Sequence, residues 1–178
     1  MFLVDEKVVY PGHGVAQITR TIERHIAGNT TTFYELKFLN KDMTILVPED
    51  NMARVGIRRL SSAESINVLF DLLCEPMGAK ATECAATSNW NKRNKKILGD
   101  LRKGDLARLG HIYKDLKHMA TVKELSFGEK NLLQQTEALL AQEISLVKNI
   151  SEDKAIEHLR SMFTALPGRT PTLSQTVP

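Results

Sequence analysis

The chain has only two cysteines and one tryptophan, and it contains no long uninterrupted hydrophobic run. Cys74 and Cys84 lack the paired CxxC or Cys/His spacing of zinc sites and redox centres, so we expect free thiols, no metal and no cofactor. The longest apolar stretch, residues 66–73, is interrupted by Asn67 and Asp71 and falls far short of the ~20 residues that span a bilayer. Acidic residues follow the first four positions too closely for a signal peptide. We therefore expect a cytoplasmic protein that does not bind membranes.

Sequence motifs that carry catalytic chemistry are also missing. The chain has no GxxxxGK[ST], GxGxxG, HExxH or GxSxG motif. His13 lies between two glycines in a turn, where backbone flexibility explains its surroundings at least as well as catalysis does. His111 and His118 have the spacing of two helical turns but no third ligand, and Asp71 and Glu75 form a like-charged i,i+4 pair typical of a solvated face. The sequence predicts a protein that is not an enzyme and has no catalytic residue.

Charge is distributed unevenly, although the formal net charge is only +3. Residues 1–87 carry a balance of −2 and residues 124–163 a balance of −3. Residues 88–123, here called the basic segment, hold 10 basic and 3 acidic side chains, a balance of +7. Such a segment attracts phosphate over about a Debye length and is typical of nucleic-acid binding, but a solvated helix face explains it equally well.

The first 60 residues alternate between polar and apolar positions as short antiparallel strands do. We expect strands at residues 7–10, 15–22, 33–39 and 43–48, with turns at residues 11–14, 27–29 and 40–42. Tyr34, Leu36 and Phe38 share one face of the third strand. Pro48 closes the fourth strand and cannot donate a ladder hydrogen bond, so it belongs at an edge or at the end of a strand. The pattern predicts an N-terminal β domain over residues 1–60, a twisted barrel or sheet of the SH3 or Tudor type.

Helical periodicity begins at Ser61. Residues 61–64 read as a capping box in which the Ser61 hydroxyl meets a free amide and Glu64 reaches back, followed by apolar residues at 66, 69, 70 and 73. Further helices are expected over residues 88–103, from an N-cap at Asp105, from a second capping box at Ser126, and from Ser151. Their expected apolar stripes comprise Leu106, Leu109, Ile112, Tyr113, Leu116 and Met119, then Leu132, Leu133, Leu139, Leu140, Ile144 and Val147, and finally Ile156, Leu159, Met162 and Phe163.

Two stretches of the C-terminal part lack such periodicity. Residues 76–87 are small and aperiodic and are expected to form a loop, and residues 164–178 are too polar and proline-rich to pack. The chain is therefore expected to be a monomer of α+β class. It would have a β domain, an all-α helical bundle over residues 61–163, and a disordered tail.

The tryptophan precedes a dense run of cations. On a helix Trp90 and Arg93 share a face with Lys96 or Asn94, which would present an aromatic ring together with groups that grip phosphates. Stacking of a base on an aromatic ring contributes about 1–3 kcal/mol and tolerates any sequence. Trp90 could equally cap the helical core. The spacing favours weak, shape-directed DNA binding.

Five short motifs occur in order along the chain: residues 8–15 (VVYPGHGV), 43–48 (MTILVP), 55–58 (VGIR), 89–93 (NWNKR) and 125–130 (LSFGEK). Together they resemble the signatures of the CarD/CdnL family of bacterial transcription regulators. Each motif is short, but their order over about residues 3–163 makes the resemblance strong.

The resemblance implies two binding activities. An N-terminal Tudor-like domain, also found in the transcription-repair coupling factor, would bind the lobe of the RNA polymerase β subunit. The helical domain would contact promoter DNA at the upstream edge of the melted bubble, where Trp90 wedges into the minor groove and slows bubble collapse. By motif position, the further DNA contacts are Lys92, Arg93, Lys95 and Lys130, and the polymerase contacts are Leu46 and Pro48. Lys96 is also expected to contact DNA, and Arg24 to contact polymerase.

The chain departs from the family pattern at two positions. Some members have arginine in place of Leu46, so an apolar polymerase contact is expected here. Asn94 stands where an aromatic residue is common, so the packing beneath Trp90 is expected to differ. Helicase motifs, which the coupling factor contains, are absent.

Two other functions remain open from sequence. The β domain could itself bind RNA or DNA as a stand-alone module, which requires exposed aromatic and basic residues that residues 1–60 do not hold in excess. The chain could also be a structural scaffold. In that case reversing the charges of Lys92, Arg93, Lys95 and Lys96 would leave its function intact.

Overall fold

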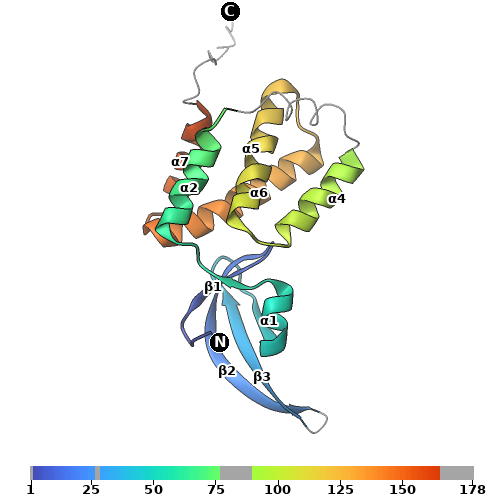
Figure 1. Ribbon diagram of the computed structural model, residues 1–178, viewed down its shortest axis with the longest axis vertical. Helices are drawn as coiled ribbons and strands as arrows, with labels where there is room; N and C mark the ends of the chain where they lie inside the picture. Colours follow the sequence, from blue (N-terminus) through green and yellow to red (C-terminus); the bar gives the residue numbers. More distant parts are fainter. Residues whose placement is uncertain (1, 27–28, 77–89, 165–178) are drawn as a thin grey trace, which may run out of the picture.

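A computed structural model describes residues 2–26, 29–76 and 90–164, with side chains except at positions 26, 90–94 and 164. The N-terminal part is an antiparallel sheet with strand order β4-β3-β2-β1-β5, which leaves β4 and β5 at its two edges. The strands are β1 (Lys7–Tyr10), β2 (Gly14–Ile26), β3 (Asn29–Phe38), β4 (Thr44–Pro48) and β5 (Arg58–Arg59). A bundle of helices follows it, and the two parts lie end to end along the longest axis (Figure 1). The α+β class predicted from the sequence is confirmed, and Pro48 is the last residue of the edge strand β4.

The β2–β3 hairpin is longer than the strands predicted over residues 15–22 and 33–39. Its pairing continues past Ile22 and Phe33 as far as Ile26 and Asn29, so the hairpin projects beyond the rest of the sheet (Figure 1). The added residues 23–25 and 29–32 are polar and exposed or half-buried, so they carry no apolar alternation by which a strand could be recognised. Their threonines nevertheless suit an extended backbone.

A short helix that the sequence analysis did not predict closes the core of the sheet. α1 (Glu49–Val55) starts directly after β4, and its buried residue is Met52. It ends at Gly56, whose φ of 83° is a left-handed conformation that glycine adopts without strain. The core of this sheet half (residues 2–60) comprises Val8, Ala16, Ile18, Tyr34, Leu36, Phe38, Val47, Met52 and Ile57. The predicted inward face of the third strand is thus confirmed.

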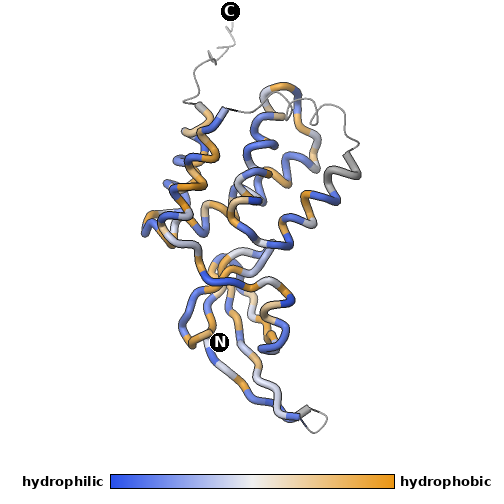
Figure 2. Tube along the Cα trace, in the orientation of Figure 1, coloured by the Kyte–Doolittle hydropathy of each residue, from blue (hydrophilic) through white to orange (hydrophobic). Residues whose placement is uncertain are grey.

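The helical half (residues 61–164) contains five described helices. They are α2 (Ala63–Cys74), α4 (Trp90–Leu101), α5 (Leu106–Val122), α6 (Phe127–Lys148) and α7 (Glu152–Thr164). Of the predicted loop only residue 76 is described, and of the predicted tail only Thr164, as the last residue of α7. Hydrophobic and hydrophilic residues alternate along these helices (Figure 2), as expected of helices that bury one side.

The predicted stripes form one continuous core. Leu109 and Tyr113 of α5, Leu140 of α6 and Leu159 of α7 are buried in a single cluster with α2 and the last turn of α4. The capping box at Ser126 is present in full, since Ser126 Oγ accepts from the Glu129 amide and Glu129 accepts from the Ser126 amide. Asp105 is the N-cap of α5, although its side chain makes no capping hydrogen bond.

The capping box predicted at Ser61 is wrong by one residue. The N-cap of α2 is Ser62, whose hydroxyl accepts from the Ser65 amide. Ser61 instead donates its amide to Glu143, 82 residues further along the chain. Ser61, which the local sequence pattern placed at the start of the helix, is therefore held by a tertiary hydrogen bond to Glu143 instead.

Candidate DNA and protein interfaces

α4 carries the residues that the sequence analysis assigned to DNA. Trp90, Lys92 and Arg93 lie in its first turn, and their side chains are outside the described residues. Lys95 and Lys96 are exposed, and on the other side of the helix Leu101 is buried in the helical core. α4 begins at the end of the helical half that is far from the sheet and runs toward the sheet (Figure 1). Packing of Leu101 thus anchors the end of α4 opposite to Trp90.

The structure divides the cations of the basic segment into two groups. Lys114 is buried and donates to the Leu72 carbonyl, and Arg108 forms an ion pair with Asp100 at 3.1 Å. Lys103 also lies within 3.7 Å of Asp100. Much of the segment's charge is therefore used within the helical half. Lys95 and Lys96, by contrast, form no salt bridge with any residue that the structure describes.

Lys130 lies in the first turn of α6, directly after the second capping box. Its Nζ pairs with Glu124 Oε1 at 3.0 Å, and both side chains are well exposed. An exposed pair of this kind contributes little stability, so a phosphate could replace the carboxylate at small cost.

The three residues assigned to polymerase share one face of the sheet. In the strand register, Pro48 pairs with Phe33 and Phe33 with Ile22, while Leu46 pairs with Glu35. Directly paired residues point to the same face, and so do residues two apart on a strand. The outer face of β2–β3–β4 therefore carries Leu46, Pro48, Phe33, Ile22, Arg20 and Arg24, whereas the intervening Tyr34, Leu36 and Val47 point into the core.

This outer face combines apolar side chains with charged ones, since Glu35 lies opposite Leu46 and pairs with Arg20 at 2.8 Å. Leu46 is 40% exposed, and Phe33, Ile22 and Pro48 are half-buried. The Arg24 guanidinium lies 6.0 Å from the centre of the Phe33 ring, within the range of a cation–π contact. Phe33 and Ile22 were not predicted from the sequence. Phe33 alternates out of phase with the buried Tyr34 and Leu36, so its signal was available. Ile22 keeps the phase of the buried Ile18, and only the register shift between Ile18 and Arg20 turns it to the outer face.

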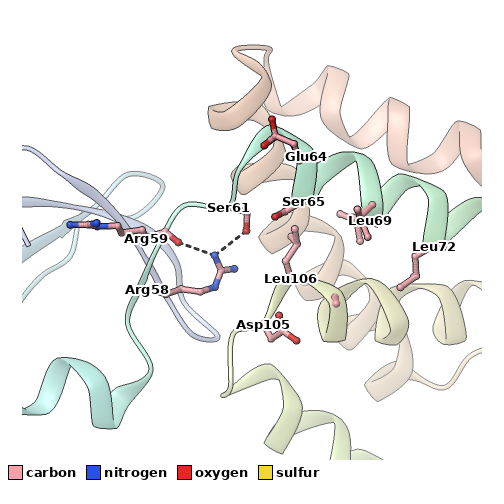
Figure 3. Close-up of a pocket in the computed structure, with 11 residues that line it drawn as sticks. Arg58, Arg59, Ser61, Glu64, Ser65, Leu69, Leu72, Asp105 and Leu106 are labelled. Atoms are coloured by element: carbon pink, nitrogen blue, oxygen red, sulfur yellow. Dashed lines mark hydrogen bonds between the residues drawn. The ribbon is translucent and has the colours of Figure 1, made fainter.

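A groove of about 460 Å³ lies where the segment between β5 and α2 meets α2 and the start of α5. Arg58, Ser61, Leu69, Leu72 and Leu106 are among its lining residues, and Figure 3 shows Arg58 pointing toward Ser61. Within the described residues, no cluster of three or more His, Cys, Asp or Glu could hold a metal ion. No helix among them is long and apolar enough to cross a membrane.

Known protein families match both the sheet half and the helical half of the chain. The family described as "CarD, C-terminal domain" matches residues 75–160, and the "CarD-like/TRCF RID domain" matches residues 2–61. The chain belongs to the CarD/CdnL family. A relative from Bacillus subtilis (strain 168) named "Putative transcription factor YdeB" is 22% identical over 152 residues, which cover 85% of this chain and 95% of the relative. The family resemblance of the motifs is thus confirmed, and this CarD-family chain has a transcription-associated role.

Proposed function

We propose that this CarD-family protein binds the RNA polymerase β subunit through its sheet half and stabilises the open promoter complex through α4. In this proposal the two halves act as separate domains, residues 1–60 and 61–163. The observation that carries it is the pair of exposed lysines, Lys95 and Lys96, that follow Trp90 on a helix whose opposite side is packed into the core. Cations on such a helix can contact phosphates without unfolding the bundle.

The outer face of β2–β3–β4 supports the polymerase contact. The apolar side chains of Leu46 and Phe33 can be buried against another protein, with the Glu35–Arg20 ion pair beside them. β4 is also an edge strand, so its outer backbone groups can pair with a strand of a partner. The polymerase residues in this proposal are Leu46, Pro48 and Arg24, and we add Phe33 and Ile22 because they share the same face.

Attachment to polymerase compensates for weak DNA affinity. A tethered α4 meets promoter DNA at a high effective concentration, so its contacts become intramolecular. If Trp90 and the neighbouring cations bind the melted bubble more tightly than the closed duplex, the open population rises by that difference in affinity. The mechanism needs no covalent chemistry, and we propose a non-enzymatic function.

The lifetime of the open complex with Trp90→Ala tests the proposal. We expect the variant to bind polymerase like the wild type and to shorten the lifetime toward that of polymerase alone. The shorter lifetime would correspond to the loss of one base–aromatic contact, which contributes about 1–3 kcal/mol. An unchanged lifetime, with the variant folded and bound, would contradict the role of Trp90.

One observation favours a second function, nucleic-acid binding by the sheet itself. Arg24 lies over the Phe33 ring on the outer face, and such a pair can also stack with a base. Filter binding of the full chain separates the two functions. Weaker nucleic-acid binding by the Arg24→Ala, Phe33→Ala variant would indicate that the sheet is the binding site. Weaker binding by the Lys95→Ala, Lys96→Ala variant would indicate that α4 is the binding site.

A further inference from the structure

The sheet half and the helical half meet at a group of directional polar contacts. Arg58 of β5 donates from Nη1 and Nη2 to the two carboxylate oxygens of Glu143 at 2.7 and 2.8 Å. Its Nε donates to the Gly104 carbonyl at 2.8 Å. Gly104 belongs to the turn between α4 and α5, so one guanidinium joins the sheet to α6 and to the turn that follows α4.

Glu143 is the buried centre of this junction. Its residue is 1% exposed, and besides Arg58 it accepts from the Ser61 amide at 2.9 Å. Oε1 accepts from both Arg58 and Ser61, and Oε2 from Arg58, so each oxygen faces at least one N–H donor. Both carboxylate oxygens must therefore be acceptors for the geometry to hold.

The preceding residue of α6 makes a second contact with the sheet. Gln142 Oε1 accepts from the Val15 amide of β2 at 3.0 Å. Gly14 leaves room for the Gln142 side chain, because a Cβ at that position would collide with its amide oxygen. Consecutive residues of α6 are thus bonded to two different strands, which resists both tilting and sliding of the helix against the sheet.

Apolar packing contributes to the junction but carries little directional information. Most buried hydrophobic residues belong to two clusters, one inside the sheet half and one inside the helical half. Val9 and Val15 are buried outside both clusters, and Pro11 lies close to Gly104 at the junction. Because apolar burial is non-directional, we expect the hydrogen bonds described above to define the angle between the halves.

We propose that Arg58 and Glu143 are positioning residues that set the orientation of α4 relative to the outer face of the sheet. The effect on transcription rests on the function proposed above. With polymerase bound at the sheet, a fixed orientation places Trp90 at the DNA in every bound molecule. A loose junction leaves each contact surface intact but populates the productive orientation only part of the time.

Two substitutions loosen the junction through different atoms. Arg58→Lys keeps the charge but cannot supply the paired donors to Glu143 together with the donor to Gly104. Glu143→Gln keeps the size of the side chain but replaces one of its two acceptor oxygens with an NH2 group. Both positions face an N–H donor, so either orientation of the amide brings two donors together and loses a hydrogen bond. The matched control is Arg160→Lys, because Arg160 also binds a buried carboxylate with two donors, that of Glu137, but within the helical half.

The direct readout is the distance between the halves in the full chain. Spin labels at Lys37 of β3 and Val122 of α5, both exposed, report it in a Cys74→Ser, Cys84→Ser background. We expect a narrow distance distribution for the wild type and for Arg160→Lys, and a broad one for Arg58→Lys and Glu143→Gln. Thermal unfolding confirms that each variant is folded. Unchanged distributions in both junction variants would overturn the proposal.

The functional readout is the open-complex lifetime at saturating protein. We expect the junction variants to lose at least about fivefold of the lifetime gain while keeping their affinity for polymerase and for DNA. A short bismaleimide bridge between Asn40→Cys and Glu152→Cys, whose native side chains hydrogen-bond at 2.8 Å across the junction, should restore it. If Arg58→Lys and Glu143→Gln without the bridge give the same open-complex lifetime as the wild type, the positioning role is overturned. If the wild type itself does not lengthen the lifetime, the proposed function fails. The distance distributions then still test whether Arg58 and Glu143 set the orientation of the two halves.

Discussion

Phe33 of β3 lies directly opposite Pro48 of β4 on the face of the sheet that points away from the core. Leu46, two residues before Pro48, extends this apolar row along the edge strand. A single exposed leucine needs no explanation in a folded protein, but an aromatic ring, a proline and a leucine on one free face form a surface that a partner can cover.

Removing this surface should weaken polymerase binding. We expect Leu46→Ala with Phe33→Ala to lower the affinity for the polymerase β subunit roughly tenfold, because truncated anchors at an interface centre cost about 1–2 kcal/mol. Titration calorimetry with the purified subunit measures the loss. Leu39→Ala is the matched control, since Leu39 is 41% exposed, as Leu46 is at 40%, but follows the end of β3. Equal affinity of all three proteins would exclude the outer face as the contact.

The single tryptophan makes the accessibility of Trp90 directly measurable. If Trp90 is available to DNA, its fluorescence should resemble that of indole in water and be quenched strongly by acrylamide. Addition of a forked promoter duplex should then reduce the quenching, because stacking covers the ring. Blue-shifted emission that resists acrylamide would indicate an indole inside the bundle and would defeat the wedging role.

The exposed cations of α4 should contribute more to DNA affinity than the cations of the basic segment that form ion pairs. We expect Lys95→Ala with Lys96→Ala to weaken DNA binding and to reduce the slope of log K against log[salt] by about 1–2, since each phosphate contact contributes about 0.9. Lys103→Ala with Arg108→Ala removes the same charge from residues that lie beside Asp100. That control should change the slope less. Equal effects of the two double variants would indicate a diffuse charge effect.

The helical half should lose stability in acid through Glu137. Burial alone would raise the pKa of Glu137, but hydrogen bonds from Arg160 and Tyr113 outweigh burial and hold the pKa below its ordinary value of 4.5. A lowered folded-state pKa gives stability that is fully present above about pH 4.5 and is lost as pH falls through the folded-state pKa. Urea unfolding at pH 7 and in steps below pH 4.5 measures this dependence.

Glu137→Gln provides the control for the acid effect. We expect it to cost about 1–3 kcal/mol at pH 7, because a buried hydrogen-bonded carboxylate is replaced by a group that cannot accept from Arg160 on both atoms. The variant should also show a shallower loss of stability in acid. A dependence as steep as that of the wild type would assign the acid sensitivity to other carboxyls, such as Glu129, whose pKa is also lowered.

Several elements could be predicted because their signals are local. The apolar stripe of α5, from Leu106 to Met119, is buried throughout, and the capping box of Ser126 and Glu129 forms as its spacing requires. α1 and β5 were missed, since an element of seven or of two residues is too short to show a period. The motifs also indicated the family, which the comparisons confirm.

The sequence by itself determined the class of the fold, the inward faces of its long elements and the place of Trp90 at the start of a basic helix. Only the tertiary structure decided which cations stay available, since Lys114 is buried against the Leu72 carbonyl while Lys95 remains exposed. It also decided that Ser61 and Arg58 meet at Glu143. The physical reason is that periodicity and capping act within a few residues, whereas a buried carboxylate selects donors wherever the fold brings them together.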